Sequence, residues 1–269
     1  MLLAIDVGNT QTVIGMFADP GPGSNGNGSR SVASALVHHW RISSHVERTS
    51  DEMAMIISQL LDLQGFDVEE AVDGIAVASV VPRTTAALRE MTERWLPVKT
   101  VIVEPGIRTG MPILYDNPKE VGADRIADAV AAFEQFGGPT IVVDFGTATT
   151  VEAISAKGEY LGGAIVPGIE ISLDALFARA AALRRVELVE PRNVIGKNTV
   201  EAIQSGALYG FAGQVDGLCA RFEEELGAST VVATGGLAGL IAPLTSCIDH
   251  HEPWLTLNGL RIIFQRNLA

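Results

Sequence analysis

Short hydrophobic runs alternate along the chain with longer segments in which apolar residues recur every three or four positions. In the first half, five runs have the length and composition of strands: 2–7, 11–17, 35–42, 74–82 and 99–106. Two segments with helical periodicity, 48–63 and 85–96, precede the last two runs. The predicted order is therefore β-β-β-α-β-α-β, which is typical of a mixed sheet with helices packed against it.

The segment 48–63 carries a helix-start signal. Thr49 followed by Glu52 predicts a capping box, in which each side chain bonds the backbone N–H of the other residue. The apolar positions expected to form one buried face of this helix are Met53, Ile56, Ile57, Leu60 and Leu61.

Two links join the three opening strands. The first is so short that 2–7 and 11–17 are predicted to form a hairpin. The second, 18–30, is rich in Gly, Asn, Ser and Pro. It predicts a flexible, exposed loop that lengthens an ordinary hairpin turn.

The second half repeats the pattern that opens the chain. The stretch "PTIVVDFGTATTVEAI" (139–154) matches "MLLAIDVGNT": an apolar run, an acid, one apolar residue, a glycine and small polar residues. Asp6 and Asp144 hold corresponding positions. The later predicted elements are a strand in 157–168, a helical zone at 168–184, one helix or two at 199–226, a strand leading into a glycine turn at 230–239, and a helix at 255–266. We expect duplicated α/β domains, 1–118 and 119–269, facing each other across a cleft.

The net charge of the chain disfavours some classes of binding partner. The chain has 269 residues, a formal net charge of −13 and 47% hydrophobic residues, which argues against nonspecific binding to nucleic acid or anionic membranes. A phosphate-bearing ligand would need a divalent cation or backbone N–H groups to offset this negative charge.

Because no basic segment precedes the first strand and no apolar run approaches the roughly 18–20 residues of a spanning helix, we expect a cytoplasmic protein. Cys219 and Cys247 fit no metal or redox spacing and are expected to be buried, reduced thiols.

The turns "DVGNT" and "DFGTATT" are the first candidates for chemistry. Their glycines permit close approach to the backbone, and carboxylates such as Asp6 and Asp144 suit hard cations. The hydroxyl donors are Thr10, Thr12, Thr147, Thr149 and Thr150, with turn N–H groups beside them. Two such turns would bind a triphosphate and its metal from both sides. The glycine-rich turn 233–239 would allow an adenine ring to pack against the backbone without a side-chain clash. The alternative is that Asp-x-Gly is an ordinary turn signal. The chain has no Walker A loop, since 196–199 lacks its first glycine, and no dinucleotide fingerprint.

The stretch "NPKEVGADRIAD" is the second candidate. Asp124 and Arg125 lie just inside a predicted helix start, after Gly122. Arg125 suits a bidentate grip on a carboxylate or phosphate. Asp124 suits a weak, well-positioned base for a hydroxyl that attacks a phosphoryl group. The alternative is an Asp–Arg pair that only stabilises the helix start, and Asp128, one turn further on, is expected to be a surface or structural acid.

Five motifs in order, "IDVGNT", "YDNPKEVGADR", "VVDFGTATT", "GGAIVPG" and "GKNTVEAIQSG", resemble those of the type III pantothenate kinases. That family belongs to the acetate kinase, sugar kinase, Hsp70 and actin superfamily, and the resemblance covers essentially the whole chain. It implies two ribonuclease H-like domains of the actin-like ATPase type, a homodimer, and transfer of the ATP γ-phosphoryl group to the terminal hydroxyl of pantothenate. That reaction is the first step of coenzyme A synthesis.

The resemblance also implies roles for individual residues. Asp124 matches the general base, Asp144 the ligand of a monovalent cation (K⁺ or NH₄⁺), and Asp6 the acid associated with Mg²⁺. The implied ATP contacts are Asp6, Val7, Gly8, Asn9, Thr10, Gln11, Thr12, Val13 and Thr147. The implied pantothenate contacts are Tyr115, Gly122, Ala123, Asp124, Arg125 and, from the partner subunit, Thr199.

Two other functions remain open at this point. A nucleotide-binding regulator or scaffold of the same fold would lack kinase turnover, although it would have no need for Asp124, Asp144 and Arg125 together. A kinase for a different hydroxylated acid would keep the mechanism and change only the substrate.

Overall fold

The computed structural model describes residues 1–18, 35–180 and 182–268, so the loop predicted at 18–30 lies, beyond its first residue, outside the described part. The chain forms two compact units. The first comprises Met1–Met111, Asp116–Ala131 and Thr256–Ala269, and the second comprises Pro112–Tyr115 and Ala132–Leu255. These units are discontinuous in sequence, whereas the domains predicted at 1–118 and 119–269 are continuous, and that division stays a prediction.

The first unit contains a five-stranded mixed sheet in the order β3-β2-β1-β4-β5. Its strands are β1 (Leu2–Val7), β2 (Gln11–Phe17), β3 (Leu36–Ser43), β4 (Gly74–Ser79) and β5 (Lys99–Ile102). β1, β2 and β3 pair antiparallel, and β4 and β5 continue parallel to β1 on its other side. The predicted hairpin and mixed sheet are thereby confirmed.

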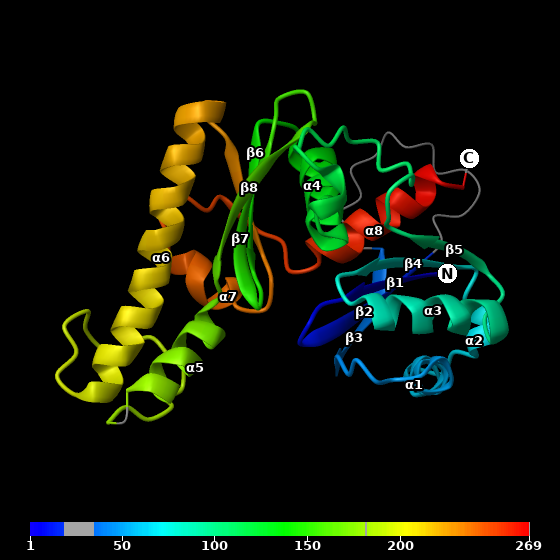
Figure 1. Ribbon diagram of the computed structural model, residues 1–269, viewed down its shortest axis with the longest axis horizontal. Coiled ribbons are helices and arrows are strands. Elements are labelled where there is room, and N and C mark those ends of the chain that lie inside the picture. Colours follow the sequence, from blue (N-terminus) through cyan, green and yellow to red (C-terminus); the bar gives the residue numbers. More distant parts are fainter. Residues whose placement is uncertain (19–34, 181, 269) are drawn as a thin grey trace. The chain divides into compact units, whose positions relative to one another are not determined.

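Helices cover both faces of this sheet (Figure 1). α1 (Ser50–Asp62) and α3 (Pro82–Arg94) pack on one face, and α2 (Val68–Ala71) is a single short turn beside them. The buried residues of this core include Leu3, Ile5, Val7, Ile14, Met16, Met53, Ile57, Leu61, Ile75, Val77, Leu88 and Met91. Burying each side chain of this size stabilises the fold by roughly 1.5–3 kcal/mol. α3 begins at Pro82 rather than at the predicted residue 85, because proline is favoured in the first turn of a helix.

α8 (Leu255–Arg266) packs on the opposite face of the first sheet. Its close approach depends on two glycines in the strands. A Cβ added to Gly74 would lie 2.2 Å from Cζ of Phe264, and one added to Gly15 would lie 2.7 Å from Cδ1 of Leu257. Since neither contact leaves room for a methyl group, these glycines allow the helix to lie directly on the sheet.

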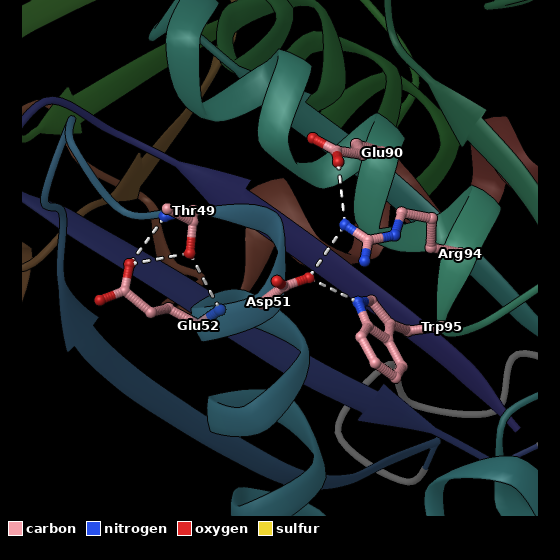
Figure 2. Close-up of polar contacts among 6 residues, drawn as sticks. All are labelled: Thr49, Asp51, Glu52, Glu90, Arg94 and Trp95. Atoms are coloured by element: carbon pink, nitrogen blue, oxygen red, sulfur yellow. Dashed lines mark hydrogen bonds and ion pairs between the residues drawn. The ribbon is translucent and has the colours of Figure 1, made fainter.

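The predicted capping box starts α1, as Figure 2 shows. The backbone N–H of Thr49 donates to Oε2 of Glu52 at 2.8 Å, and the backbone N–H of Glu52 donates to Oγ1 of Thr49 at 3.3 Å. Asp51, one residue before, accepts from Nε1 of Trp95 at 2.9 Å and pairs with Arg94 at 3.2 Å. This carboxylate therefore ties the start of α1 to the end of α3.

The second unit repeats the topology of the first. Its sheet has the order β10-β9-β6-β7-β8, with strands β6 (Thr140–Phe145), β7 (Ala148–Ile154), β8 (Tyr160–Pro167), β9 (Thr230–Thr234) and β10 (His250–His251). β6, β7 and β8 pair antiparallel, and β9 and β10 run parallel to β6 on its other side. The weak sequence repeat is thus a repeat of topology, with β6 in the place of β1.

Three helices belong to the second unit. α5 (Ile169–Arg179) ends before the predicted limit of 184, and α6 (Thr199–Leu226) is one continuous helix. α7 (Ala238–Ile241) follows β9, and α6 and α7 share a core with Ile141, Val143 and Phe145 of β6. A 3₁₀ turn spans Ala242–Leu244. α4 (Ala123–Phe136) follows the 3₁₀ turn Pro118–Glu120, and both the turn and the helix as far as Ala131 belong to the first unit. Among the described helices, none is both long and apolar enough to cross a bilayer.

Candidate functional site

The turn between β1 and β2 is closed by hydrogen bonds of its own. The N–H of Gly8 donates to the carbonyl of Gln11 at 3.0 Å. Ser44, which follows β3, donates from Oγ to the carbonyl of Gly8 at 2.7 Å, and its N–H donates to the carbonyl of Thr10 at 2.9 Å. Its Oγ also lies 2.9 Å from Oγ1 of Thr12. Ser44 thus fixes the turn, a contact that sequence-based prediction missed because nothing in the local pattern marks it.

Burial divides the predicted ATP contacts of this turn into two groups. Val7 is 0% exposed and Thr12 is 1% exposed, so their side chains belong to the protein interior. Asn9, Thr10 and Gln11 are exposed, and Asp6, Gly8 and Val13 are half-buried. Only the second group presents side chains or backbone at the surface of the turn. The amide of Gly8 is used within the turn and is not a free donor for a ligand.

At the start of α4, the Asp124 carboxylate folds back over Gly122. The N–H of Arg125 donates to Oδ1 of Asp124 at 2.8 Å. A Cβ added to Gly122 would lie 2.3 Å from the same oxygen, so only glycine leaves space for the carboxylate there. The carbonyl of Gly122 accepts from the N–H of Ile126 at 3.1 Å, which makes Gly122 the last residue before the helix. Asp124 lies in the first turn of α4, as expected, and the positive end of a helix dipole favours an acid at this position.

In the second unit, Asp144 is the last residue but one of β6, as Asp6 is of β1 in the first unit. The N–H of Gly146 donates to the carbonyl of Ala148 at 3.1 Å, which closes the turn. The turn after β9 meets the acid directly: Gly235 has φ +95°, and a Cβ added there would lie 2.3 Å from Oδ1 of Asp144 and 2.6 Å from the nitrogen of Phe145. The glycine-rich turn predicted to face adenine is therefore in contact with Asp144.

The two threonines of "DFGTATT" on β7 face opposite sides of the sheet. Thr149 shares the face of Val151, which lies in the helical core, and Thr150 pairs directly with Asp144. Within the described residues, neither Oγ1 atom has a hydrogen-bond partner, and both atoms are buried. Since strand alternation turns Thr149 away from Asp144, Thr150 is the threonine on the side of this acid. Thr147, in the turn itself, is exposed.

Thr199 is the first residue of α6 and is exposed. Asn198 caps the helix, since its side chain accepts from the N–H of Glu201 at 2.9 Å. Glu201 also pairs with Arg192 and accepts from the N–H of Lys197 at 3.2 Å. These contacts, Arg192 first, lower the pKa of the Glu201 carboxyl. The start of α6 borders an open cavity of about 800 Å³ between residues of α5 and α6.

Two cysteines that are distant in sequence lie together in the second unit. Cys219 is buried, Cys247 is half-buried, and both are free thiols. The Cys219 thiol, together with burial, raises the pKa of Cys247 far above its usual range. Asp216 holds the loop at Cys247: burial acts to raise its pKa, but hydrogen bonds from the N–H groups of Ser246 and Cys247 outweigh burial and lower it.

The predicted site residues are shared between the two units. Asp6 to Val13 and the stretch Gly122 to Arg125 belong to the first unit. Tyr115, Asp144, Thr147 and Thr199 belong to the second. In the first unit, Gly122 lies against the carboxylate of Asp124. In the second unit, Gly235 lies against the carboxylate of Asp144. Tyr115 packs against Gly162 and Tyr160 of β8.

Comparison with known proteins agrees with this architecture. A Campylobacter jejuni protein provisionally named a Baf family transcriptional activator has the same fold, with a TM-score of 0.60, 19% identity and coverage of 99% of this chain and 98% of that one. A Listeria monocytogenes protein provisionally named an N-acetylmannosamine kinase gives a TM-score of 0.52 at 13% identity, over 100% of this chain and 99% of that one. These likenesses confirm the predicted fold class, duplicated α/β domains of the sugar kinase and actin-like ATPase type.

Sequence comparison identifies the family. The model of the type III pantothenate kinase family matches residues 2–221. A Streptomyces griseus protein named type III pantothenate kinase is 53% identical, over 100% of this chain and 99% of its own length. One of the same name from Moorella thermoacetica is 54% identical, over 99% of this chain and 100% of its own. The chain belongs to the type III pantothenate kinase family.

Proposed function

We propose that this protein transfers the γ-phosphoryl group of ATP to the terminal hydroxyl of pantothenate, producing 4'-phosphopantothenate and ADP in the first step of coenzyme A biosynthesis. Membership of the family supports the reaction. The observation that carries the chemistry is the Asp124 carboxylate, held over Gly122 in the first turn of α4.

Asp124 is the general base in this proposal. As the pantothenate hydroxyl oxygen bonds to the γ-phosphorus, the bond from that phosphorus to the bridging oxygen breaks, and ADP leaves with the electron pair. The hydroxyl proton passes to Asp124. A weak base suffices, because phosphoryl transfer depends mainly on positioning and on stabilisation of charge. The N–H of Arg125, 2.8 Å from Oδ1, fixes the direction of the carboxylate.

ATP contacts would come from the turn at Asp6 to Val13 and from Thr147. Within the turn, the exposed positions Asn9, Thr10 and Gln11 suit phosphate and ribose contacts, and Gly8, whose N–H is bonded within the turn, would let a ligand approach without a side chain in the way. The buried side chains of Val7 and Thr12 would act by shaping the turn. Thr147 would supply a hydroxyl from the second unit.

Asp6 would hold Mg²⁺, which would neutralise negative charge on the phosphate groups of ATP. The chemistry of the donor fits this ion, because a carboxylate oxygen is a natural ligand of hard cations. Mg²⁺ usually binds through one or two carboxylates, with phosphates and water as the other ligands. A single half-buried carboxylate at a strand end is therefore sufficient.

Asp144 would bind the monovalent cation, K⁺ or NH₄⁺. Two observations fit such an ion. The backbone of Gly235 lies directly against the Asp144 carboxylate, since a Cβ added to Gly235 would be 2.3 Å from Oδ1. Thr150, paired with Asp144 across the hairpin, carries a buried hydroxyl with no hydrogen-bond partner in the described part of the chain. Buried hydroxyls are rarely left in this state unless an ion or water completes them.

The acceptor would be held by Gly122, Ala123 and Arg125, with Tyr115 from the second unit. Arg125 has the planar donor group that binds a carboxylate in two places, and pantothenate carries one carboxylate. Ala123 is 8% exposed, so it would contribute its backbone rather than its side chain.

A homodimer is part of the proposal, with Thr199 reaching the acceptor site of the partner subunit. Support comes from the side chains near Thr199. Val194 and Ile195 are 64% and 79% exposed, and Val200 is exposed beside them. Several exposed large apolar side chains within a short segment make that segment a candidate for a protein interface. Sedimentation of the wild type and of Ile195→Asp would test this, since the substitution should produce monomers.

The direct test is turnover. Purified protein should convert pantothenate and ATP to 4'-phosphopantothenate and ADP in the presence of Mg²⁺ and K⁺ or NH₄⁺. Asp124→Asn should reduce kcat by at least about 100-fold while leaving the fold intact, because it removes the proton acceptor. Asp62→Asn, an exposed acid at the end of α1, is the matched control and should retain activity.

The other functions are outcomes of the same assay. ATP binding by a folded protein without turnover of pantothenate would contradict the proposal and favour a regulator or scaffold. Turnover of another hydroxylated acid in preference to pantothenate would retain the kinase mechanism and change the substrate.

A further inference from the structure

Glu152, near the end of β7, is a buried carboxylate that the proposed reaction does not use. It is 1% exposed, and Oη of Tyr160, itself 0% exposed, donates a hydrogen bond to its Oε2. Burying an ionised acid costs free energy unless partners compensate it. The burial of Glu152 therefore suggests a role that outweighs its cost in stability.

Two glycines precede Ala164 in "GGAIVPG", and both lie against this arrangement. Gly163 pairs with Glu152 across the sheet, and a Cβ added to it would lie 2.3 Å from the carbonyl oxygen of Val151 and 2.5 Å from Oε2 of Glu152. Gly163 therefore allows the close approach of both the neighbouring strand and the acid. Gly162 has φ +127°, which favours glycine, and its position next to the ring of Tyr115 would put an added Cβ 3.4 Å from Cε2, an ordinary contact.

Tyr160 also holds the segment 112–115 through its backbone. Its N–H donates to the carbonyl of Pro112 at 2.9 Å, and its carbonyl accepts from the N–H of Leu114 at 2.8 Å. The rings of Tyr160 and Tyr115 lie 6.3 Å apart at an angle of 56°, within the range of favourable aromatic pairs. All of these residues lie in the second unit.

We propose that the buried Glu152–Tyr160 pair is a positioning device, which fixes the ring of Tyr115 for contact with pantothenate. Glu152 holds the Tyr160 hydroxyl, and Tyr160 holds the strand segment and packs against the ring. Neither residue needs to touch the substrate. This role rests on the proposed function, since it assigns Tyr115 to the acceptor site.

The decisive variant is Tyr160→Phe, which removes one hydroxyl and retains the ring. It should raise the KM for pantothenate roughly three- to tenfold, the equivalent of one lost hydrogen bond, with a much smaller effect on kcat and on the KM for ATP. Glu152→Gln keeps an oxygen to accept from Tyr160 but weakens the bond, so it should raise the same KM by less. Glu152→Gln also preserves the test if Tyr160→Phe fails to fold.

Tyr209→Phe is the matched control. Tyr209 donates to Oε1 of Glu190 at 3.1 Å, so this substitution also removes a tyrosine–glutamate hydrogen bond, but an exposed one on α6. It should leave the KM for pantothenate unchanged. In a Tyr115→Leu background, Tyr160→Phe should have no further effect on this KM, because the ring that it positions is absent.

Each contrary outcome is distinct. An unchanged KM for pantothenate in Tyr160→Phe and Glu152→Gln, or an equal effect with and without Tyr115, would overturn the positioning role and leave the proposed function standing. A parallel loss of kcat and of affinity for both substrates, accompanied by a lower melting temperature, would show a purely structural pair. Failure of the wild type to phosphorylate pantothenate would overturn the proposed function, and the positioning role with it.

Discussion

Replacing Gly235 with alanine should damage both the stability of the second unit and its response to a monovalent cation. Gly235 has φ +95°, which costs an L-residue about 1–2 kcal/mol. The new Cβ would also lie 2.3 Å from Oδ1 of Asp144 and 2.6 Å from the nitrogen of Phe145. Ordinary contacts lie near ~3.5 Å, and relieving such overlap costs a further ~1–3 kcal/mol.

Gly137→Ala separates these two costs. Gly137 has φ +74° and lies in the same unit, but an added Cβ would have no atom within 4 Å. It should therefore show the backbone cost alone. The difference between the two variants in the free energy of unfolding, measured with urea and circular dichroism, should be about 1–3 kcal/mol, the cost of the overlap.

The carboxylate is one group that can move to relieve the overlap, so the cation response is measured on the same proteins. Kinase turnover of Gly235→Ala should need a higher concentration of K⁺ or NH₄⁺ for half-activation than that of Gly137→Ala. Equal destabilisation by the two substitutions would refute the overlap. A larger loss of stability with unchanged activation by the cation would instead refute the assignment of Asp144 as its ligand.

Three further changes test other parts of the structure. Gly122→Ala should lower kcat with little change in stability, because its Cβ would lie 2.3 Å from the Asp124 carboxylate; parallel kinetics and urea unfolding would measure both. Thr49→Ala should reduce the free energy of unfolding by about 1 kcal/mol through loss of the cap, without affecting turnover. Because the pKa of Asp216 is lowered in the folded state, its stabilising effect should be present above the pKa of the unfolded chain and be lost as the pH falls through the pKa of the folded state. Urea unfolding of Asp216→Asn between neutral and acid pH should therefore show a smaller loss of stability on acidification than the wild type.

Local patterns predicted every strand of the two sheets except the two-residue β10. The runs at 2–7 and 11–17 coincide with β1 and β2, and the Thr49–Glu52 capping box starts α1. These signals are contained in a few consecutive residues. The short elements α2, α7 and β10 were not predicted, since two to four residues are too few to establish a periodicity.

Contacts between residues that are far apart in the sequence could not be predicted from local patterns, because they form only when the chain folds. Ser44 closes the first turn from a position after β3, and Gly235 meets Asp144 from the turn after β9. The resemblance to a family marked Asp144 but gave no reason for the glycine. Tyr160 and Glu152 look like ordinary strand residues, and only the pairing of β7 with β8 brings them together.

The duplicated topology allows the two acids to be compared at equivalent positions. Asp6 is paired with Val13 on one neighbouring strand and with Ala78 on the other, whereas Asp144 is paired with Thr150 and Thr234.

The neighbours favour different ions for the two acids. A metal at Asp6 gains no oxygen ligand from the paired side chains and must draw on phosphate and water, which suits Mg²⁺ bound with ATP. An ion held by Asp144, as proposed, would have hydroxyl-bearing residues on both sides, which suits a weakly hydrated monovalent cation. Thr150→Val, which keeps the shape of the side chain and removes only its hydroxyl, should therefore weaken activation by the cation, and Val13→Ala should not. Equal activation of both variants by K⁺ would contradict this division of roles.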